Sequence, residues 1–145
     1  MNEPMKTKPP TWFWIIAGIA LAWNLMGVMA FFGQITITPE DIAKLKPEEQ
    51  ALYANIPSWV TIAFFLAVFG GALGCILLLL KKSLALQIFI ISMVGIVVQM
   101  VYNVFLSGAL DVYGPGGAIM PVMILIIGIG LIFLAKHARN AGWVS

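Results

Sequence analysis

The sequence predicts an all-α integral membrane protein: a four-helix bundle with a short helical extracytoplasmic cap between the first and second helices. Three observations predict it. Hydrophobic residues make up 61% of the chain and charged residues only 10%, whereas charged residues are about a quarter of a soluble domain. The chain contains four apolar runs, each of about 20 residues, the length at which a helix crosses the hydrocarbon core. Most of the basic residues lie on one side of these runs.

A single transmembrane domain accounts for residues 1–145. The apolar runs predict transmembrane helices at residues 12–32, 59–80, 84–106 and 118–135. Each run is continuous, unlike the short alternating strands of a β-barrel. The only cysteine, Cys75, lies in the second run. It has no partner for a disulfide within the chain, and we interpret it as an apolar packing residue.

The charges predict the orientation, because short loops rich in Lys and Arg stay in the cytoplasm. The basic residues that precede the first run, separate the second from the third, or follow the fourth are Lys6, Lys8, Lys81, Lys82, Lys136 and Arg139. Both termini are therefore expected in the cytoplasm, and the lipid bilayer is the expected surrounding. The net charge of +2 reports this orientation and gives no reason to expect nucleic-acid binding.

The segment between the first two helices, residues 34–58, is predicted to lie outside the cell and to contain two short helices. Thr38 offers a hydroxyl at an N-cap and Pro39 occupies the first helical position, followed by two acidic residues. Pro47 repeats this arrangement. We expect these helices to cap the bundle or to lie on the membrane surface. Residues 107–117, which are rich in glycine, predict a flexible outer loop.

Glycines indicate where helices approach closely. Gly70 and Gly74 form a small-xxx-small pair in the second run, and Gly27 and Gly95 offer contact points in the first and third. The pair is expected either to pack helices within one copy or to join two copies. Four helices of this size leave little lumen in a single copy. We therefore expect a homo-oligomer, and its number of copies stays open.

The third run carries an ordered line of polar and small residues. Ser92, Gly95, Gln99 and Asn103 are spaced at i, i+3, i+7 and i+11, which places them on one face of a helix. Unpaired amides in hydrocarbon cost several kcal/mol each, roughly. This face is therefore expected to look into protein or into a wetted cavity.

Other polar and aromatic residues are expected at similar depths. Asn24 lies near the middle of the first run beside Trp23, while Thr61 and Tyr102 lie near the outer ends of theirs. Together with the stripe they predict an uncharged pocket that opens outward, where amides form hydrogen bonds and aromatic faces stack. Such chemistry suits a sugar or polyol better than an ion. The alternative is that Asn24 and Gln99 bond across helices as packing contacts, as is common in membrane bundles.

Several reaction classes lack the residues they need. A proton- or cation-coupled antiporter needs a carboxylate in the membrane, and the runs contain none. Haem or metal electron transfer needs His or Cys ligands within the bundle. A hydrolase needs a base beside its nucleophile, and Ser92 has no His, Asp or Lys at its depth. We therefore expect no enzymatic activity, no metal and no cofactor.

The chain also resembles a group of small bacterial four-helix inner-membrane proteins that are labelled as sugar transporters. The resemblance covers most of the length and rests on the segments Trp23-Asn24-Leu25-Met26-Gly27-Val28-Met29, Gln50-Ala51-Leu52-Tyr53, Pro57 with Trp59, Phe69-Gly70-Gly71 with Leu73-Gly74, and Gln99-Met100 with Tyr102-Asn103. It implies the four-helix fold, a bacterial inner-membrane location and transport. The residues themselves leave two functions as expectations. The amide stripe with Trp23 and Tyr102 favours a transporter or channel component for small neutral solutes, and the packing interpretation with the outer cap favours a non-transporting accessory subunit.

Overall fold

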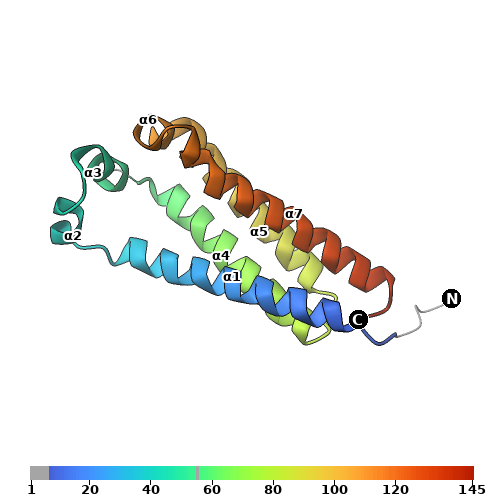
Figure 1. Ribbon diagram of the computed structural model, residues 1–145. Coiled ribbons are helices and arrows are strands. Elements are labelled where there is room, and N and C mark those ends of the chain that lie inside the picture. The colour runs from blue at the N-terminus through green and yellow to red at the C-terminus, as the bar shows by residue number, and fades with distance from the viewer. Residues whose placement is uncertain (1–6, 55) are drawn as a thin grey trace.

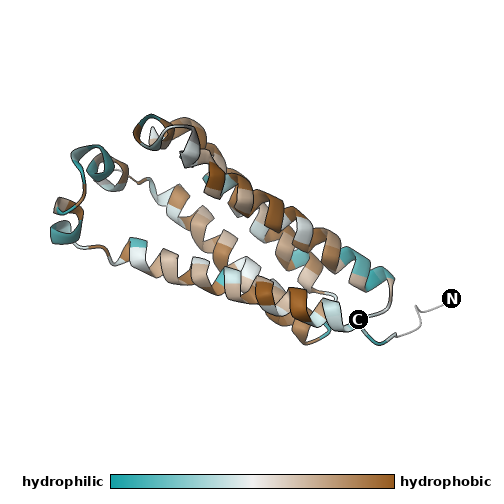
Figure 2. Ribbon diagram, in the orientation of Figure 1, coloured by the Kyte–Doolittle hydropathy of each residue, from teal (hydrophilic) through white to brown (hydrophobic). Residues whose placement is uncertain are grey.

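The computed structural model describes residues 7–54 and 56–145; Lys6, one of the basic residues used above to predict the orientation, lies outside them. All regular structure in the described residues is helical. Within this part of the chain, four segments are long and apolar enough to cross a membrane, and Figure 2 shows hydrophobic residues along their length. The chain is therefore a multi-pass helical membrane protein.

The long helices are α1 (Thr11–Ile35), α4 (Ser58–Leu79), α5 (Ala85–Val101) with its continuation η1 (Tyr102–Leu106), and α7 (Ile119–Asn140). The short helices are α2 (Pro39–Ala43), α3 (Pro47–Ala54), α6 (Ala109–Tyr113) and η2 (Pro115–Ala118). The short helices α2, α3 and α6 gather at one end of the molecule, which we call the cap end (Figure 1). The C-terminus lies at the opposite end, which we call the terminal end.

Three of the long segments end differently from the prediction. Helix α1 continues past residue 32 to Ile35. The third apolar run does not stay α-helical to residue 106, because its last turn is a π-helix in which the N–H of Ser107 donates to the carbonyl oxygen of Tyr102 at 2.7 Å. The fourth helix continues past residue 135 to Asn140. It stops there because Gly142, with φ of 80°, adopts the left-handed conformation that commonly follows a helix.

Residues 107–117 do not form the loop that their glycines predict. They contain α6 and η2, and Gly108 and Gly114 flank α6 with φ of 78° and 72°. The hydroxyl of Ser107 accepts a hydrogen bond from the N–H of Ala109 at 3.1 Å. The prediction is wrong because these glycines make the sharp turns that begin and end a short helix.

Helix α2 begins at a capping box. The N–H of Asp41 donates to the hydroxyl oxygen of Thr38 at 3.1 Å, and the N–H of Thr38 donates to the carboxylate of Asp41 at 3.4 Å. These two bonds satisfy N–H groups that the first helical turn leaves without a partner. The side-chain amide of Gln50 in α3 donates to the carbonyl oxygen of Leu45 at 2.9 Å, which ties α3 to the link before it.

The long helices pack in the order α1, α4, α5, α7. The α4–α5 contact is close because Gly70 lies against Ser92, Gly74 lies against Phe89, and Gly95 lies against the backbone of α4. The glycine pair of α4 is thus engaged by α5 of the same chain. A second copy would have to use another face.

The terminal end is closed by aromatic contacts around Trp143. Its ring centroid lies 5.3 Å from that of Trp12 at the start of α1 and 4.9 Å from that of His137 in α7. The backbone after α7 then turns back to the α4–α5 link, where the N–H of Ser145 donates to the carbonyl oxygen of Lys81 at 3.0 Å. All four long helices are therefore tied together at this end.

Candidate functional site

A cavity of about 730 Å³ lies between the long helices in the half of the molecule toward the cap end. Its walls come from α1, α4, α5 and α7, and residues of α3 and α6 line the part nearest the cap end, which we call its mouth. The volume falls within the range of about 300–1,000 Å³ that is typical of small-molecule sites. The expectation that one copy leaves little lumen is therefore wrong.

The cavity exists because the core that joins all four long helices lies in the other half. The main core contains Phe13 of α1, Leu78 of α4, Phe89 of α5 and Ala135 of α7, all toward the terminal end. Helices α1 and α7 occupy the two ends of the packing order. In Figure 1 they diverge toward the cap end. Large side chains such as Phe64 fill only part of this space, so a void far larger than an ordinary packing defect remains.

The structure brings most of the predicted site residues together. The predicted residues that line the cavity are Trp23, Asn24, Ser92, Gln99, Tyr102 and Asn103. Thr61 is not among the lining residues, whereas Val60 and Phe64 of the same helix are. Because each helical residue is rotated by about 100° from the one before it, Val60 and Thr61 cannot both point into the cavity.

Two of these polar residues hold helices together at the floor of the cavity. The side-chain amide of Asn24 donates to the carbonyl oxygen of Ala20 at 2.8 Å and to the sulfur of Cys75 on α4 at 3.7 Å. The hydroxyl of the buried Ser92 donates to the carbonyl oxygen of Ala67 at 2.7 Å. Both residues have therefore found partners on their own or the neighbouring helix.

Gln99 and Asn103 behave differently. Within the described part of the chain, their side chains make no hydrogen bond to protein, and no buried side-chain nitrogen or oxygen is left without a partner. Both residues are half-buried and line the cavity. Their amide groups therefore reach its open volume, where a solute or water can bond to them.

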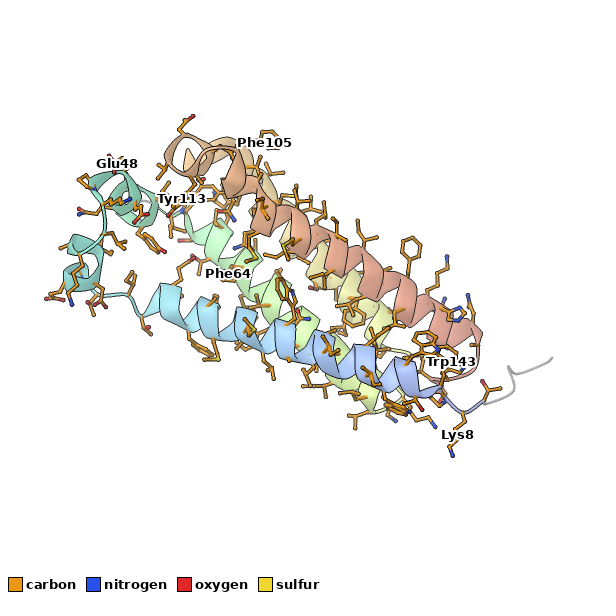
Figure 3. All side chains as sticks on the ribbon, viewed as in Figure 1. Lys8, Glu48, Phe64, Phe105, Tyr113 and Trp143 are labelled. Carbon is orange, nitrogen blue, oxygen red and sulfur yellow. The ribbon has the colours of Figure 1, made fainter. Side chains whose placement is uncertain are left out.

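Aromatic side chains line the space next to these amides. The ring of Tyr102 packs edge-on against Trp59, with centroids 5.7 Å apart. Phe64 projects from α4 into the space between α1 and α7, as Figure 3 shows. With Trp23 on α1, these rings offer flat apolar faces beside hydrogen-bonding groups. This combination suits the alternating CH and OH surfaces of a polyhydroxylated solute.

The mouth contains residues that the sequence did not indicate as site residues. Gln34 at the end of α1, Tyr53 of α3 and Tyr113 of α6 all line the cavity. Partial burial, then the nearby negative charge of Glu49 and then Tyr53, raise the pKa of Tyr113 above its ordinary value. Helices α3 and α6 thus meet across the mouth. The apolar face of residues 47–54 could have indicated that Tyr53 lines the site. Nothing in the sequence indicated that Tyr113 lies opposite Tyr53.

The site is uncharged. None of the described lining residues is Lys, Arg, Asp or Glu, and no cluster of metal-ligating side chains occurs in the described ranges. A full charge would find no counter-charge here. The chemistry available to the cavity is hydrogen bonding by neutral groups and contact with aromatic and aliphatic surfaces.

Comparisons with known proteins found no relative. The chain matches no protein-family model, no curated protein and no solved structure. The resemblance to proteins labelled as sugar transporters therefore stays a prediction, and function is inferred from the geometry of the cavity.

Proposed function

We propose that the protein is a transporter or channel component that binds small neutral polar solutes, such as sugars or polyols, in the cavity. The observation that carries this proposal is the pair of amides, Gln99 and Asn103, that reach the cavity without a protein partner among the described residues. Amides that only hold helices together bond to a neighbouring helix, as Asn24 does. A polar solute would complete the hydrogen bonding of both amides inside the membrane.

The proposal includes an orientation in the bacterial inner membrane. The terminal end, with Lys81 and Lys82, faces the cytoplasm, and the cap end faces outward. The mouth of the cavity then faces outward, and the main core lies on the cytoplasmic side. Lys44→Cys is expected to react with an impermeant maleimide added to intact cells, and Lys82→Cys only after lysis. The native Cys75 is fully buried and gives little background. External labelling of Lys82→Cys would reverse the orientation.

Solute flux in proteoliposomes tests the function directly. Wild type is expected to pass some members of a panel of sugars and polyols faster than empty liposomes, and to pass ions no faster. Gln99→Leu and Asn103→Leu are expected to reduce that flux at least tenfold while the protein stays folded. Thr61→Val is the matched control, because Thr61 is a polar residue of α4 that does not line the cavity. Absence of flux from folded wild-type protein would end the transport proposal.

The second candidate is a non-transporting accessory subunit. The hydrogen bonds of Asn24 and Ser92 to α4 support it, because they use polar groups of the cavity lining for helix packing. In that case Gln99→Leu and Asn103→Leu would leave the cell's transport unchanged. Both candidates are non-enzymatic. Self-association remains a separate prediction, and cross-linking in native membranes tests it.

A further inference from the structure

A second hollow adjoins the cavity along the seam between α1 and α7. It is a groove of about 570 Å³, lined by side chains that include Ile16 and Ile19 of α1 and Phe133 and Leu134 of α7. Trp23, Ile127 and Leu131 line both the cavity and the groove. The two hollows are therefore neighbours with a shared wall, and they follow each other along the length of the molecule.

The polarity of the lining changes along this path. The cavity, toward the cap end, is lined in part by the polar side chains of Gln34, Gln99, Asn103 and Tyr113. The groove, toward the terminal end, is lined almost entirely by apolar side chains, with His137 at its far end. No Lys, Arg, Asp or Glu appears among the described residues of either lining. A molecule that fits both hollows has an uncharged polar head and an apolar tail.

The groove opens to the side of the molecule. Ile19 of α1 and Phe133 of α7 line it and remain 66% and 65% exposed. Such apolar surface on a spanning helix faces lipid hydrocarbon. A groove in that surface gains dispersion contacts only when a chain of matching shape fills it. An alkyl chain can therefore enter from the bilayer without crossing water.

We propose that the ligand of this site is an uncharged amphiphile of the bilayer, whose hydroxyl-bearing head binds Gln99 and Asn103 and whose single alkyl chain lies along the α1–α7 seam. The inference rests on the proposed function of the cavity and narrows its solute class from free sugars or polyols to neutral lipids. The alkyl chain passes Trp23 and ends beside Phe133. The head remains on the outward side of the membrane.

Binding of dodecyl glucoside to the protein in phosphatidylcholine nanodiscs tests the inference. Affinity, corrected with empty nanodiscs, is expected to rise at least tenfold from methyl to dodecyl glucoside. Gly130 lines the groove, and a Cβ added there meets nothing within 4 Å. Gly130→Phe therefore fills the groove in a folded protein and is expected to weaken dodecyl glucoside binding at least tenfold. Gly18→Phe is the matched control, since Gly18 has the same free space and does not line the groove.

The outcomes separate this inference from the transport proposal. Binding of dodecyl glucoside that depends on Gly130 supports the inference even if no sugar or polyol crosses the liposome. Equal affinity of wild type and Gly130→Phe would overturn it even if sugar flux is intact. Equally tight binding of dodecyl phosphate or dodecyltrimethylammonium would also overturn it, because an uncharged site should reject both ions.

Discussion

The hydroxyl of Ser92 on α5 donates a hydrogen bond of 2.7 Å to the carbonyl oxygen of Ala67 on α4. The polar stripe of α5 changes its role one turn beyond this bond. As far as Gly95, α5 lies tightly against α4, with Phe89 packed on Gly74 and Gly95 on the α4 backbone. Further toward the cap end, Gln99 and Asn103 face the cavity. One face of a single helix thus supplies both a packing contact and a candidate binding surface.

This division predicts that two substitutions differ in their effect on stability. Ser92→Ala removes a buried bond between helices and is expected to lower the free energy of unfolding by about 1 kcal/mol. Gln99→Leu removes no protein hydrogen bond among the described residues. It is expected to change the free energy of unfolding by less than about 0.5 kcal/mol. Unfolding in mixed micelles with increasing dodecyl sulfate measures both values. A larger loss for Gln99→Leu than for Ser92→Ala would mean that Gln99 is a packing residue.

Replacing a glycine by alanine should have different effects on stability in α5 and in α1. A Cβ on Gly95 would come within 2.6 Å of the carbonyl oxygen of Ala63 and 2.9 Å of the backbone nitrogen of Ala67. Backbone atoms cannot rotate away, so Gly95→Ala is expected to cost about 1–3 kcal/mol of stability. Gly18→Ala meets nothing within 4 Å and is expected to be neutral, or stabilising by up to about 1 kcal/mol. The same micelle titration compares them, and equal stabilities would contradict the α4–α5 packing.

The sequence predicted the long helices and the cap of α2 because the causes of both are local. A run of apolar residues is enough to predict a spanning helix, and Thr38 followed by Pro39 is enough to predict an N-cap. The second bond of the capping box, from the N–H of Thr38 to Asp41, came from the structure. The π-turn at Tyr102 and the extension of α7 to Asn140 were missed. The π-turn leaves the apolar pattern unchanged, whereas the extension of α7 runs past the end of the apolar run into Lys136 and Arg139. Each depends on which carbonyl a particular N–H reaches.

The candidate site was less predictable because periodicity gives the face of a helix but not its partner. Gln99 and Asn103 were indicated by their spacing, whereas Thr61 was chosen by depth alone and lies outside the cavity lining. Tyr113 was missed because it comes from a segment predicted as a loop. The divergence of α1 and α7, which creates the cavity, depends on long-range packing, and local sequence patterns do not predict such packing.

A turn between α4 and α5 offers a stabilising substitution. Lys81 has φ of 62°, and it is the one non-glycine residue with positive φ in the described ranges. A side chain in this left-handed conformation costs roughly 1–2 kcal/mol, and glycine avoids that cost. Lys81→Gly is therefore expected to raise the free energy of unfolding by about 1 kcal/mol. Lys82→Gly removes the same charge from a residue with an ordinary backbone conformation, and it should not raise the free energy of unfolding. Equal effects of the two substitutions would contradict the strain at Lys81.

The mouth of the cavity should respond to alkaline pH through Tyr113. Burial first, and then the charge of Glu49, raise its pKa. A group whose pKa is raised by folding binds its proton more tightly in the folded state, so stability is complete below the ordinary tyrosine pKa of about 10 and falls as the pH rises through the raised value. Ionised Tyr113 would face Glu49 across the mouth. We therefore expect the contact between α3 and α6 to weaken only at strongly alkaline pH.

Ultraviolet titration of tyrosine ionisation measures this shift, because the chain has only three tyrosines. Tyr113→Phe is expected to remove a late-ionising component from the wild-type curve. Glu49→Gln is expected to move that component to lower pH without abolishing its delay, because burial, the larger cause, remains. Glu48→Gln is the matched control on the same helix and should leave the curve unchanged. If Tyr113→Phe removes an early component instead, Tyr113 is freely solvated and α3 does not meet α6 across the mouth.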